Sequence, residues 1–416
     1  ASDEGAAATH YVPEGYPTIQ NAIDSAKAGD EIIIKRGTYW EFIRVNKAIT
    51  IRGSGSGGTI LKVQRPGTII SMQSSSITLE HLELQGVHGV TGIGGDLVMD
   101  CYLGFIKVTD CSRGIHISKG DDLVIRGCSV RGSNEVGLYV GGSVTYRFEN
   151  IIIKDSVFNG NNGKGVELER CRYVEIDGLT ASNNGRWGLV AFKVVHAHIR
   201  NSTLTSNDIG LKLEDSHAWK VEDNKVSKNR WEGIQLNESG GEVDNVLRRN
   251  RIVENSRESG TSYPGISFSG NGASSNLLEY NVIQYNPVGV RFNSSNGGCW
   301  NNYFYLNEFR DCSYAIMELK GTGPNTYILN SFRDNFNQAS GLNVRSEFDD
   351  GTKGNYWSDY KAKYEAAVKD GYVWDKPYQV DPYGSVFDDR PLVYPYEDNP
   401  PVVDLVGETT VSIGVP

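Results

Sequence analysis

Three charged residues in the middle of the sequence have the types and spacing of an acid–base site. Glu167, Lys212 and Glu214 each follow a glycine by two or four residues, inside short segments in which apolar and polar residues alternate. If these segments are β-strands, the three side chains point outward on the same face. Two carboxyl groups roughly 6.5–9.5 Å apart are typical of inverting glycosidases, and a carboxylate beside a lysine can perform β-elimination. The pattern therefore indicates cleavage of a polysaccharide, by hydrolysis or by elimination.

Other outward positions on the same segments have the composition of a ligand-binding surface. The candidates are Tyr139, Glu169, Trp187, Trp231, Gln235 and Arg291. The two tryptophans lie in turns just before a repeated glycine, where an exposed ring can stack on a sugar; packing of the rings at a corner is the alternative. Mixed charges also occur on any solvated sheet. The sequence therefore leaves open whether this surface binds a ligand, cleaves one or only faces water.

A recurring Gly-apolar-x-apolar pattern predicts the structure that positions these residues. It starts at Gly114, Gly137, Gly165, Gly188, Gly210, Gly233, Gly265 and Gly289, in steps of 22 to 32 residues. Two more short alternating segments follow most copies, and strands this short are stable only when each copy stacks on the next. The predicted fold class is all-β: a right-handed, single-stranded parallel β-helix of about 10–12 turns.

Asparagine recurs at a fixed offset from these glycines. Three or four residues before a repeated glycine stand Asn134, Asn162, Asn184, Asn207, Asn229 and Asn286. Asparagine tolerates the left-handed backbone of a tight corner and can hydrogen-bond to its equivalent one turn along. A column of asparagines at one corner of the helix is therefore predicted.

The pattern changes towards both ends of the chain, which predicts caps. Residues 1–15 are expected to form a flexible, processed N-terminus, and 16–345 the β-helix, with an amphipathic helix over 18–29 covering its first turn. Residues 346–398, rich in Tyr and Trp, are expected to cap the other end. The last segment, 399–416, is similar to a linker followed by the first strand of an immunoglobulin-like (PKD-type) domain, which predicts that the natural protein continues further.

Composition and charge narrow the function classes. A net charge of −10 argues against nucleic acid as a partner, because phosphate binding relies on clustered Lys and Arg. The sequence contains no run of about 18 apolar residues, so no membrane span is predicted. The expected location is extracellular, at the cell surface. The expected partner is a glycan or a surface protein, and the oligomeric state is left open.

The cysteines and histidines give no metal-site signature. Two pairs could form disulfides between neighbouring turns, with buried free thiols as the alternative: Cys111 with Cys128, and Cys299 with Cys312. His196 and His198 alternate on one predicted strand and are the candidates for copper ligands, but no Cys or Met cluster accompanies them. No metal site and no cofactor are predicted.

Two motifs near the end of the sequence resemble those of a known family. Gly354-Asn-Tyr-Trp-Ser-Asp-Tyr360 and the downstream Asp389-Arg-Pro-Leu392 resemble the C-terminal signature of the NosD-like family, which carries the carbohydrate-binding and sugar-hydrolysis (CASH) β-helix repeat. The opening Tyr16-Pro-Thr-Ile-Gln-Asn-Ala-Ile-Asp24 resembles the start of many β-helix proteins, so the resemblance spans roughly 16–396. It implies a surface or periplasmic protein, since the namesake helps to mature a copper enzyme in the periplasm.

The chain departs from that resemblance at one place. Relatives usually carry an Asp/Gly-rich loop after the Tyr-Trp motif, whereas Lys361 to Trp374 is a Lys/Ala/Glu-rich segment that predicts a helix. Calcium, which such a loop would bind, is therefore not supported by a motif here.

The functional hypotheses are ordered by the enzyme motifs that the sequence lacks. Gly120-Asp-Asp122 resembles the acid pair of polygalacturonases, but the motifs that accompany that pair are absent. The first hypothesis is therefore a secreted or cell-surface scaffold or adhesin without catalysis, which binds glycans along one flank. The second is a polysaccharide lyase or glycoside hydrolase that uses Glu167, Lys212 and Glu214. The third is a structural subunit of a surface layer or filament.

Overall fold

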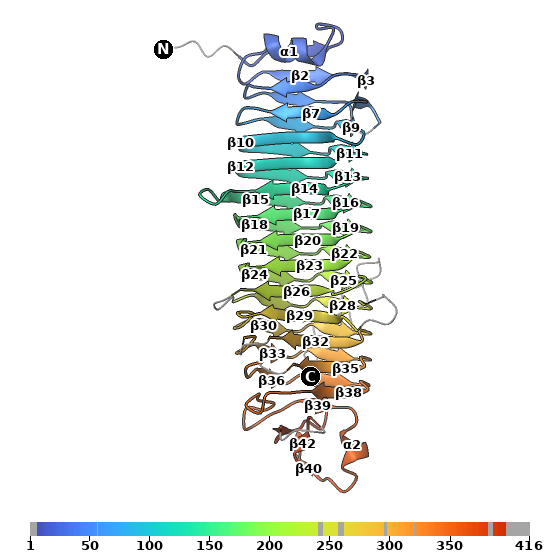
Figure 1. Cartoon of the computed structure of the whole chain (residues 1–416), viewed down its shortest axis with the longest axis vertical. Helices are drawn as coiled ribbons and strands as arrows, with labels where there is room; N and C mark the ends of the chain where they lie inside the picture. Colours follow the sequence, from blue (N-terminus) through green and yellow to red (C-terminus); the bar gives the residue numbers. More distant parts are fainter. Residues whose placement is uncertain are drawn as a thin grey trace.

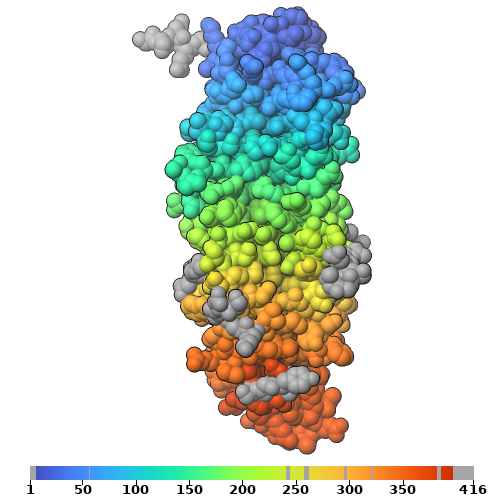
Figure 2. All heavy atoms as spheres, viewed as in Figure 1, coloured from blue at the N-terminus to red at the C-terminus, as the bar shows by residue number. Residues whose placement is uncertain are grey.

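The chain winds into a long parallel β-helix with three faces (Figure 1). The computed structural model describes residues 6–55, 57–239, 244–256, 262–294, 298–319, 322–381 and 386–396. The space-filling view shows an elongated body with the N-terminal turns at one end and the C-terminal cap at the other (Figure 2). One of the three faces, called face 3 below, contains 14 strands among the described residues. The β-helix is therefore longer than the roughly 10–12 turns predicted. The additional turns lie before Gly114 and after Gly289; the turn just before Gly114 has the equivalent Gly92, and the others lack the glycine but keep the pairing register.

Each face is a ladder of short strands from successive turns. Face 1 contains β4 (Ile43–Val45), β7 (Gly67–Met72), β14 (Val136–Gly141), β17 (Lys164–Glu169), β20 (Trp187–Phe192), β23 (Ile209–Glu214), β26 (Ile234–Glu238), β29 (Pro264–Gly270), β32 (Val288–Asn293), β35 (Tyr314–Glu318) and β38 (Asn337–Ser340). Face 2 contains β1 (Thr9–Val12), β2 (Glu31–Ile34), β5 (Thr50–Arg52), β8 (Thr78–Glu80), β15 (Phe148–Lys154), β18 (Cys171–Asp177), β21 (Val195–Arg200), β24 (His217–Glu222), β27 (Val246–Arg248), β30 (Leu277–Glu279), β33 (Tyr303–Tyr305) and β36 (Thr326–Ile328). The long strands β10 (Val90–Gly104) and β12 (Arg113–Arg126) run through both faces.

Face 3 closes each turn with a three-residue strand in most cases. It contains β3 (Gly37–Tyr39), β6 (Thr59–Lys62), β9 (Glu83–Gln85), β11 (Lys107–Thr109), β13 (Ser129–Arg131), β16 (Val157–Asn159), β19 (Thr180–Ser182), β22 (Thr203–Thr205), β25 (Lys225–Ser227), β28 (Arg251–Val253), β31 (Val282–Gln284), β34 (Glu308–Arg310), β37 (Ser331–Arg333) and β39 (Tyr356–Trp357). Because all three faces pair in parallel with constant register, equivalent residues of successive turns form straight columns.

The core follows from the alternation within each strand. On face 1, Leu138, Val166 and Leu189 occupy one inward column and are fully buried. Towards the C-terminal end the inward columns become aromatic; the Phe309 and Phe332 rings, for example, stack with centroids 4.9 Å apart. Equivalent rings stack well at this spacing because the turns repeat about every 4.8 Å.

The corners explain why the sequence is rich in Gly, Asn and Asp. At the corner between faces 2 and 3, one residue per turn adopts a left-handed backbone, for instance Asp155, Asn201 and Asp223 with φ of 49°, 49° and 56°. Glycine takes the same place in other turns, as at Gly178. These residue types tolerate positive φ at the least cost, so the sharp turn between strands recurs without a longer loop.

The predicted column of asparagines exists at the corner between faces 3 and 1. Its buried members are Asn161, Asn184, Asn207, Asn229, Asn255 and Asn286, and each accepts from the backbone N–H of the residue one turn before it. Four of the six predicted residues belong to it. Asn134 and Asn162 do not, because they lie outside the corner, where the Asn162 side chain donates to that of Asn134. The neighbouring Asn161 takes the buried position instead.

Two further asparagine columns occupy the other corners. Between faces 2 and 3 the column runs through Asn224, Asn250, Asn281, Asn307, Asn330 and Asn355, and it ends at the carboxylate of Asp388. Between faces 1 and 2 it runs through Asn245, Asn276, Asn302 and Asn325. Asp388 is fully buried, and burial raises the pKa of its carboxyl to about 7. The columns satisfy corner amides that the strand ladders cannot reach.

The N-terminal cap is a shorter helix than predicted. Helix α1 spans Ile19–Ser25, and the Thr18 hydroxyl accepts from the Asn21 amide at its start. It ends before Gly29 because Ala26 already has an extended backbone. Its buried side chains pack into the core of the first turn, as the amphipathic pattern predicts. The segment expected to be flexible also contains β1, which pairs with β2.

The C-terminal cap departs from the predicted boundaries. Strand β39 pairs with β37, so the β-helix continues past residue 345. The expected helix over Lys361 to Trp374 is wrong: α2 (Tyr360–Lys363) is one turn, and the pair β40 (Lys369–Asp370) and β41 (Val373–Trp374) follows. Gly371, at φ 63°, forms the turn between them. Strands β42 (Tyr378–Gln379) and β43 (Phe387–Asp388) complete the cap. The predicted linker and PKD-type strand, 399–416, lie outside the described residues.

The six cysteines are buried free thiols, and neither of the two disulfides considered is formed. Cys111 follows β11 at the corner between faces 3 and 1, whereas Cys128 precedes β13 at the corner between faces 2 and 3. Cys312 likewise follows β34, while Cys299 precedes β33. The members of each pair therefore lie at different corners.

One buried carboxyl group predicts how stability depends on pH. Burial raises the pKa of Glu238 to about 8 from its ordinary 4.5, and Asp215 and Glu214 add to the shift, while the Ser216 amide opposes it. Between these values the native chain keeps a proton that the unfolded chain has lost. Stability should therefore fall as pH rises, by about 1.4 kcal/mol per pH unit for this group.

Glu238→Gln should flatten that profile, since the amide oxygen still accepts from the Ser216 N–H. The measurement is the free energy of unfolding by denaturant at pH 5 and at pH 8. Glu318 and Asp388 are also buried with raised pKa values, so part of the slope remains in both proteins. Identical slopes for the variant and the natural protein would contradict the assignment.

Candidate functional site on face 1

The outward residues of face 1 form two parallel columns. The central column, defined by the pairing register, contains Arg44, Ser71, Gly94, His116, Tyr139, Glu167, Val190, Lys212, Gln235, Ser267, Arg291 and Met317. The side column, two residues further along each strand, contains Glu169, Phe192, Glu214, Asn237, Ser269 and Asn293. All the catalytic candidates and most of the binding candidates lie in these columns. Trp187 lies at the start of β20, and Trp231 precedes β26.

The two candidate catalytic carboxylates are farther apart than the sequence suggests. Glu167 is in the central column and Glu214 is in the side column, two turns away. Two turns of about 4.8 Å and two residues of about 3.3 Å place their Cα atoms roughly 12 Å apart, instead of the roughly 10 Å that two turns alone would give. Val190 lies between Glu167 and Lys212 in the central column.

The candidate acid–base residues are engaged in an ionic network around Trp187. The Lys212 ammonium lies 2.8 Å from a Glu214 carboxylate oxygen and 4.9 Å from the centre of the Trp187 ring. Lys164 forms an ion pair with Glu167, and its ammonium lies 5.2 Å from the same ring. Each lysine is held between a carboxylate and the Trp187 ring, so either one would have to leave an ion pair and a cation–π contact to reach a substrate. This network therefore resembles a stabilising cluster more than a catalytic one.

A second cluster surrounds Tyr139. Its hydroxyl donates to Glu169 at 3.1 Å, and its ring stacks on His116 with centroids 4.4 Å apart. Glu169 also forms an ion pair with Arg170. Burial, followed by the nearby Glu169 carboxylate, raises the pKa of Tyr139 well above its usual range. Tyr139 therefore acts as a neutral hydrogen-bond donor, and its partner is already part of the protein.

The third cluster has polar atoms without partners. Gln235, Ser267 and Arg291 occupy three successive turns of the central column. Among the described residues, the Ser267 hydroxyl and the Arg291 Nε are buried and make no hydrogen bond. The other end of the Arg291 guanidinium donates to the backbone oxygen of Ser262. Buried polar atoms without partners are uncommon, and these two, in adjacent turns of one column, are positions where a ligand could supply hydrogen bonds.

Aromatic rings border this cluster on the side of face 3. Trp231 and Tyr263 lie in the turns that enter β26 and β29, with ring centroids 6.0 Å apart. Glu232, next to Trp231, is buried; burial raises the pKa of its carboxyl, and Arg291 and Lys212 oppose that shift. Hydroxyl, amide and guanidinium groups beside aromatic rings are the groups that recognise sugars. We call these residues the Trp231–Arg291 cluster: Trp231, Glu232, Gln235, Tyr263, Ser267 and Arg291.

The structure thus brings together three of the predicted binding residues and separates the others. Trp231, Gln235 and Arg291 meet in one cluster, while Tyr139, Glu169 and Trp187 belong to the two clusters described before it. Three members of this cluster were not among the binding residues predicted from the sequence: Glu232, Tyr263 and Ser267. Tyr263 carries a usable signal, because it stands two residues before a repeated glycine, as Trp231 does.

The candidate copper ligands on face 2 have separate partners. His198 lies 2.9 Å from Glu222 and 3.7 Å from Glu175. His196, whose backbone is left-handed, stacks on Tyr173 at 5.6 Å. No three His, Cys, Asp or Glu side chains converge to hold a metal ion anywhere in the described ranges. The described helices also include none that is long and apolar enough to cross a membrane.

Solved structures with a similar fold include polysaccharide-acting enzymes. The A-module of the Azotobacter vinelandii mannuronan C-5 epimerase AlgE4 is 15% identical, with a TM-score of 0.54 over 78% of this chain and 91% of that one. The catalytic domain of a GH87 α-1,3-glucanase in complex with nigerose is 13% identical, with a TM-score of 0.55 over 84% and 67%. The periplasmic alginate epimerase AlgG is 12% identical, with a TM-score of 0.51 over 81% of each chain. Identities this low show the shared fold alone.

Family profiles match most of the β-helix. One described as a right-handed beta helix region matches residues 144–309, and one described as a periplasmic copper-binding protein (NosD) matches 23–211. A search of curated proteins finds no match to the sequence. The profiles overlap at residues 144–211, in turns that carry three of the repeated glycines and part of the asparagine column between faces 3 and 1. Together with the parallel coil they show that the chain belongs to the NosD-like right-handed β-helix family.

Proposed function

We propose that the protein is a secreted or cell-surface scaffold that binds a polysaccharide along face 1 without cleaving it. The observation that carries the proposal is the Trp231–Arg291 cluster, in which the Ser267 hydroxyl and Arg291 Nε lack partners beside two aromatic rings. A sugar supplies hydroxyl groups that both donate and accept, together with an apolar ring face.

The repeat of the columns suits a polymer rather than a small molecule. Polar side chains recur at successive turns from Lys212 to Arg291 in the central column, about 4.8 Å apart, which is close to the length of one sugar unit in an extended chain. Beyond Gln235, uncharged groups continue in the side column at Asn237, Ser269 and Asn293. A chain lying along face 1 can therefore meet a similar set of groups at each unit.

Binding is favoured over catalysis by the ion pairs in the centre of face 1. Glu167 is paired with Lys164, and Lys212 with Glu214. Cleavage by these residues would require breaking both pairs before a proton could move. The paired charges also give the centre of face 1 little net charge, which suits a neutral polysaccharide. A location outside the cytoplasm is supported by the periplasmic description of the matching NosD profile.

The test is the affinity for a panel of purified polysaccharides, measured by calorimetry for three proteins. Arg291→Gln should weaken binding about 10- to 100-fold, the effect of losing a hydrogen bond to a charged group. The matched control is Arg251→Gln, because Arg251 lies on face 3, in the turn that begins with β26, and has no ion pair among the described residues. The control should bind as the natural protein does.

Two results would overturn the proposal. One is equal affinity of the Arg291→Gln and Arg251→Gln proteins for every polysaccharide bound. The other is the release of new reducing ends or unsaturated products by the natural protein, abolished in Glu214→Gln, which would establish catalysis instead.

A further inference from the structure

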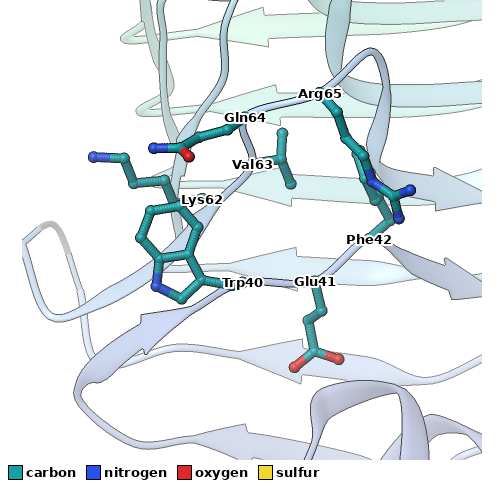
Figure 3. Close-up of a pocket in the computed structure, with 7 residues that line it drawn as sticks. All are labelled: Trp40, Glu41, Phe42, Lys62, Val63, Gln64 and Arg65. Carbon is teal, nitrogen blue, oxygen red and sulfur yellow. The ribbon is translucent and has the colours of Figure 1, made fainter.

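The N-terminal turns contain a cleft that is separate from the Trp231–Arg291 cluster. It has a volume of about 610 Å³ and lies where the segments after β3 and β6 turn from face 3 towards face 1 (Figure 3). A second hollow shares Phe42 and Arg65 with it and extends onto face 1 beside α1, over Arg44 and Ser71. Gly94 follows Ser71 in the central column and has no side chain, which leaves this part of face 1 open.

The cleft combines an exposed aromatic ring with cations. Trp40 is 60% exposed, and the Lys62 ammonium lies 5.6 Å from its ring centre. Arg65 lies 5.2 Å from the centre of the Phe42 ring. In Figure 3, Trp40, Lys62 and Gln64 lie on one side of the cleft, and Arg65 stands beside Phe42 on the other. The cleft therefore presents a ring face and two positive charges to the same space.

These cations differ from those in the centre of face 1 because they have no acidic partners. Among the described residues, Arg44, Lys62 and Arg65 form no ion pair. Glu41, which also lines the cleft, forms no ion pair with them among the described residues, and its carboxylate accepts from the first amides of α1, Ile19 N at 3.0 Å and Gln20 N at 3.1 Å. Asp24 borders the second hollow and accepts from the Gln20 side chain. Three unpaired cations are therefore gathered in a chain whose net charge is −10.

We propose that this cleft binds an anionic sugar unit, one that carries a carboxylate or a sulfate. Trp40 stacks on the sugar ring, and Arg65 and Lys62 contact the anionic group. A planar guanidinium can hold a carboxylate or a sulfate through two hydrogen bonds, and aromatic rings bind the apolar face of sugars. A nucleic acid is a poorer match, because the remaining surface of this acidic chain would repel its backbone. The site goes beyond the proposed function, since it has different residues and a different class of sugar.

The experiment measures binding of the full chain to paired probes. The anionic probes are oligogalacturonate, which carries carboxylates, and dextran sulfate. Their neutral counterparts are methyl-esterified oligogalacturonate and dextran, and a DNA duplex is included as a charged non-sugar. At least one anionic probe should bind, its neutral counterpart should bind at least about tenfold more weakly, and the affinity should fall as salt is added. Which anionic probe binds identifies the group recognised.

Variants distinguish binding at this cleft from binding on face 1 and from non-specific attraction to positive charge. Arg65→Gln and Trp40→Ala should each weaken binding of the anionic probe at least about tenfold. Arg36→Gln is the matched control, because Arg36 is an exposed arginine of the same turns that lies outside the cleft. Arg251→Gln, which lies outside both sites, should leave this binding unchanged. Failure here and failure of the proposed function are distinguishable, because Arg65→Gln tests the cleft with the anionic probes and Arg291→Gln tests face 1 with the polysaccharide panel. Thermal unfolding of each variant verifies the fold.

Three outcomes would overturn the inference. They are equal binding of anionic and neutral probes, equal losses in Arg65→Gln and Arg36→Gln, and DNA binding as tight as that of the anionic sugar. The last two would indicate non-specific attraction to positive charge.

Discussion

Replacing Asn207 by alanine is expected to lower the free energy of unfolding by about 3–5 kcal/mol, because three buried polar groups lose their partners at about 1–3 kcal/mol each. The Asn207 side-chain oxygen accepts from the backbone N–H and the side-chain amide of Asn184, both at 3.0 Å. Its own amide donates to the carbonyl of Ala181 at 3.0 Å. Water cannot replace these bonds, since Asn207 is only 2% exposed.

Asn162→Ala is the control for this prediction. Asn162 has the same offset from its glycine but is exposed, and among the described residues its side chain bonds only to that of Asn134. Its replacement should change stability by no more than about 0.5 kcal/mol. Guanidinium unfolding of the two variants measures the difference. Equal losses for Asn207→Ala and Asn162→Ala would mean that the corner columns do not hold the turns together.

Replacing Trp357 by alanine is expected to cost about 3–5 kcal/mol, the usual range for removing a large aromatic side chain from a core. Its ring stacks between Phe332 and Tyr378, with centroid distances of 4.2 and 4.3 Å, and its Nε1 donates to Asp388 at 2.8 Å. The ring therefore joins the last turn of the β-helix to the C-terminal cap. The substitution removes both the ring stack and the hydrogen bond that Nε1 donates to the buried Asp388.

Trp40→Ala provides the comparison, because Trp40 is 60% exposed and touches no part of the core stack. It should change stability by about 0.5 kcal/mol or less. Thermal unfolding followed by circular dichroism measures both variants. A melting temperature for Trp357→Ala equal to that of the natural protein would show that the cap does not stabilise the last turn.

The fold was predictable because a β-helix repeats the same short sequence pattern in successive turns. The glycines from Gly114 to Gly289 mark equivalent positions, and the alternation after each glycine gives the inward and outward columns that the structure shows. The number of turns was underestimated, since most turns outside Gly92 to Gly289 pair in the same way without the glycine. The second and third asparagine columns escaped prediction because their distances from the glycine vary with the length of the intervening turn.

The site was predictable only in outline. The column that a residue occupies follows from its offset from the repeated glycine. Gln235 and Arg291 were therefore placed correctly in one column of face 1. What a side chain contacts depends on its rotamer and on the neighbouring turns, which offsets do not specify. The pairing of Lys212 with Glu214, and the lack of a partner for Ser267, are of this kind. The N-terminal cleft lies before the first of the repeated glycines, so the repeat pattern did not point to it.

The most direct test of the account is a crystal structure of the protein with an oligosaccharide that the binding panel identifies. The account predicts sugar density along face 1, with hydroxyl groups within hydrogen-bond distance of Ser267 Oγ and Arg291 Nε and a sugar ring against Trp231 or Tyr263. Density confined to face 2 or face 3, with Ser267 and Arg291 still lacking partners, would contradict it.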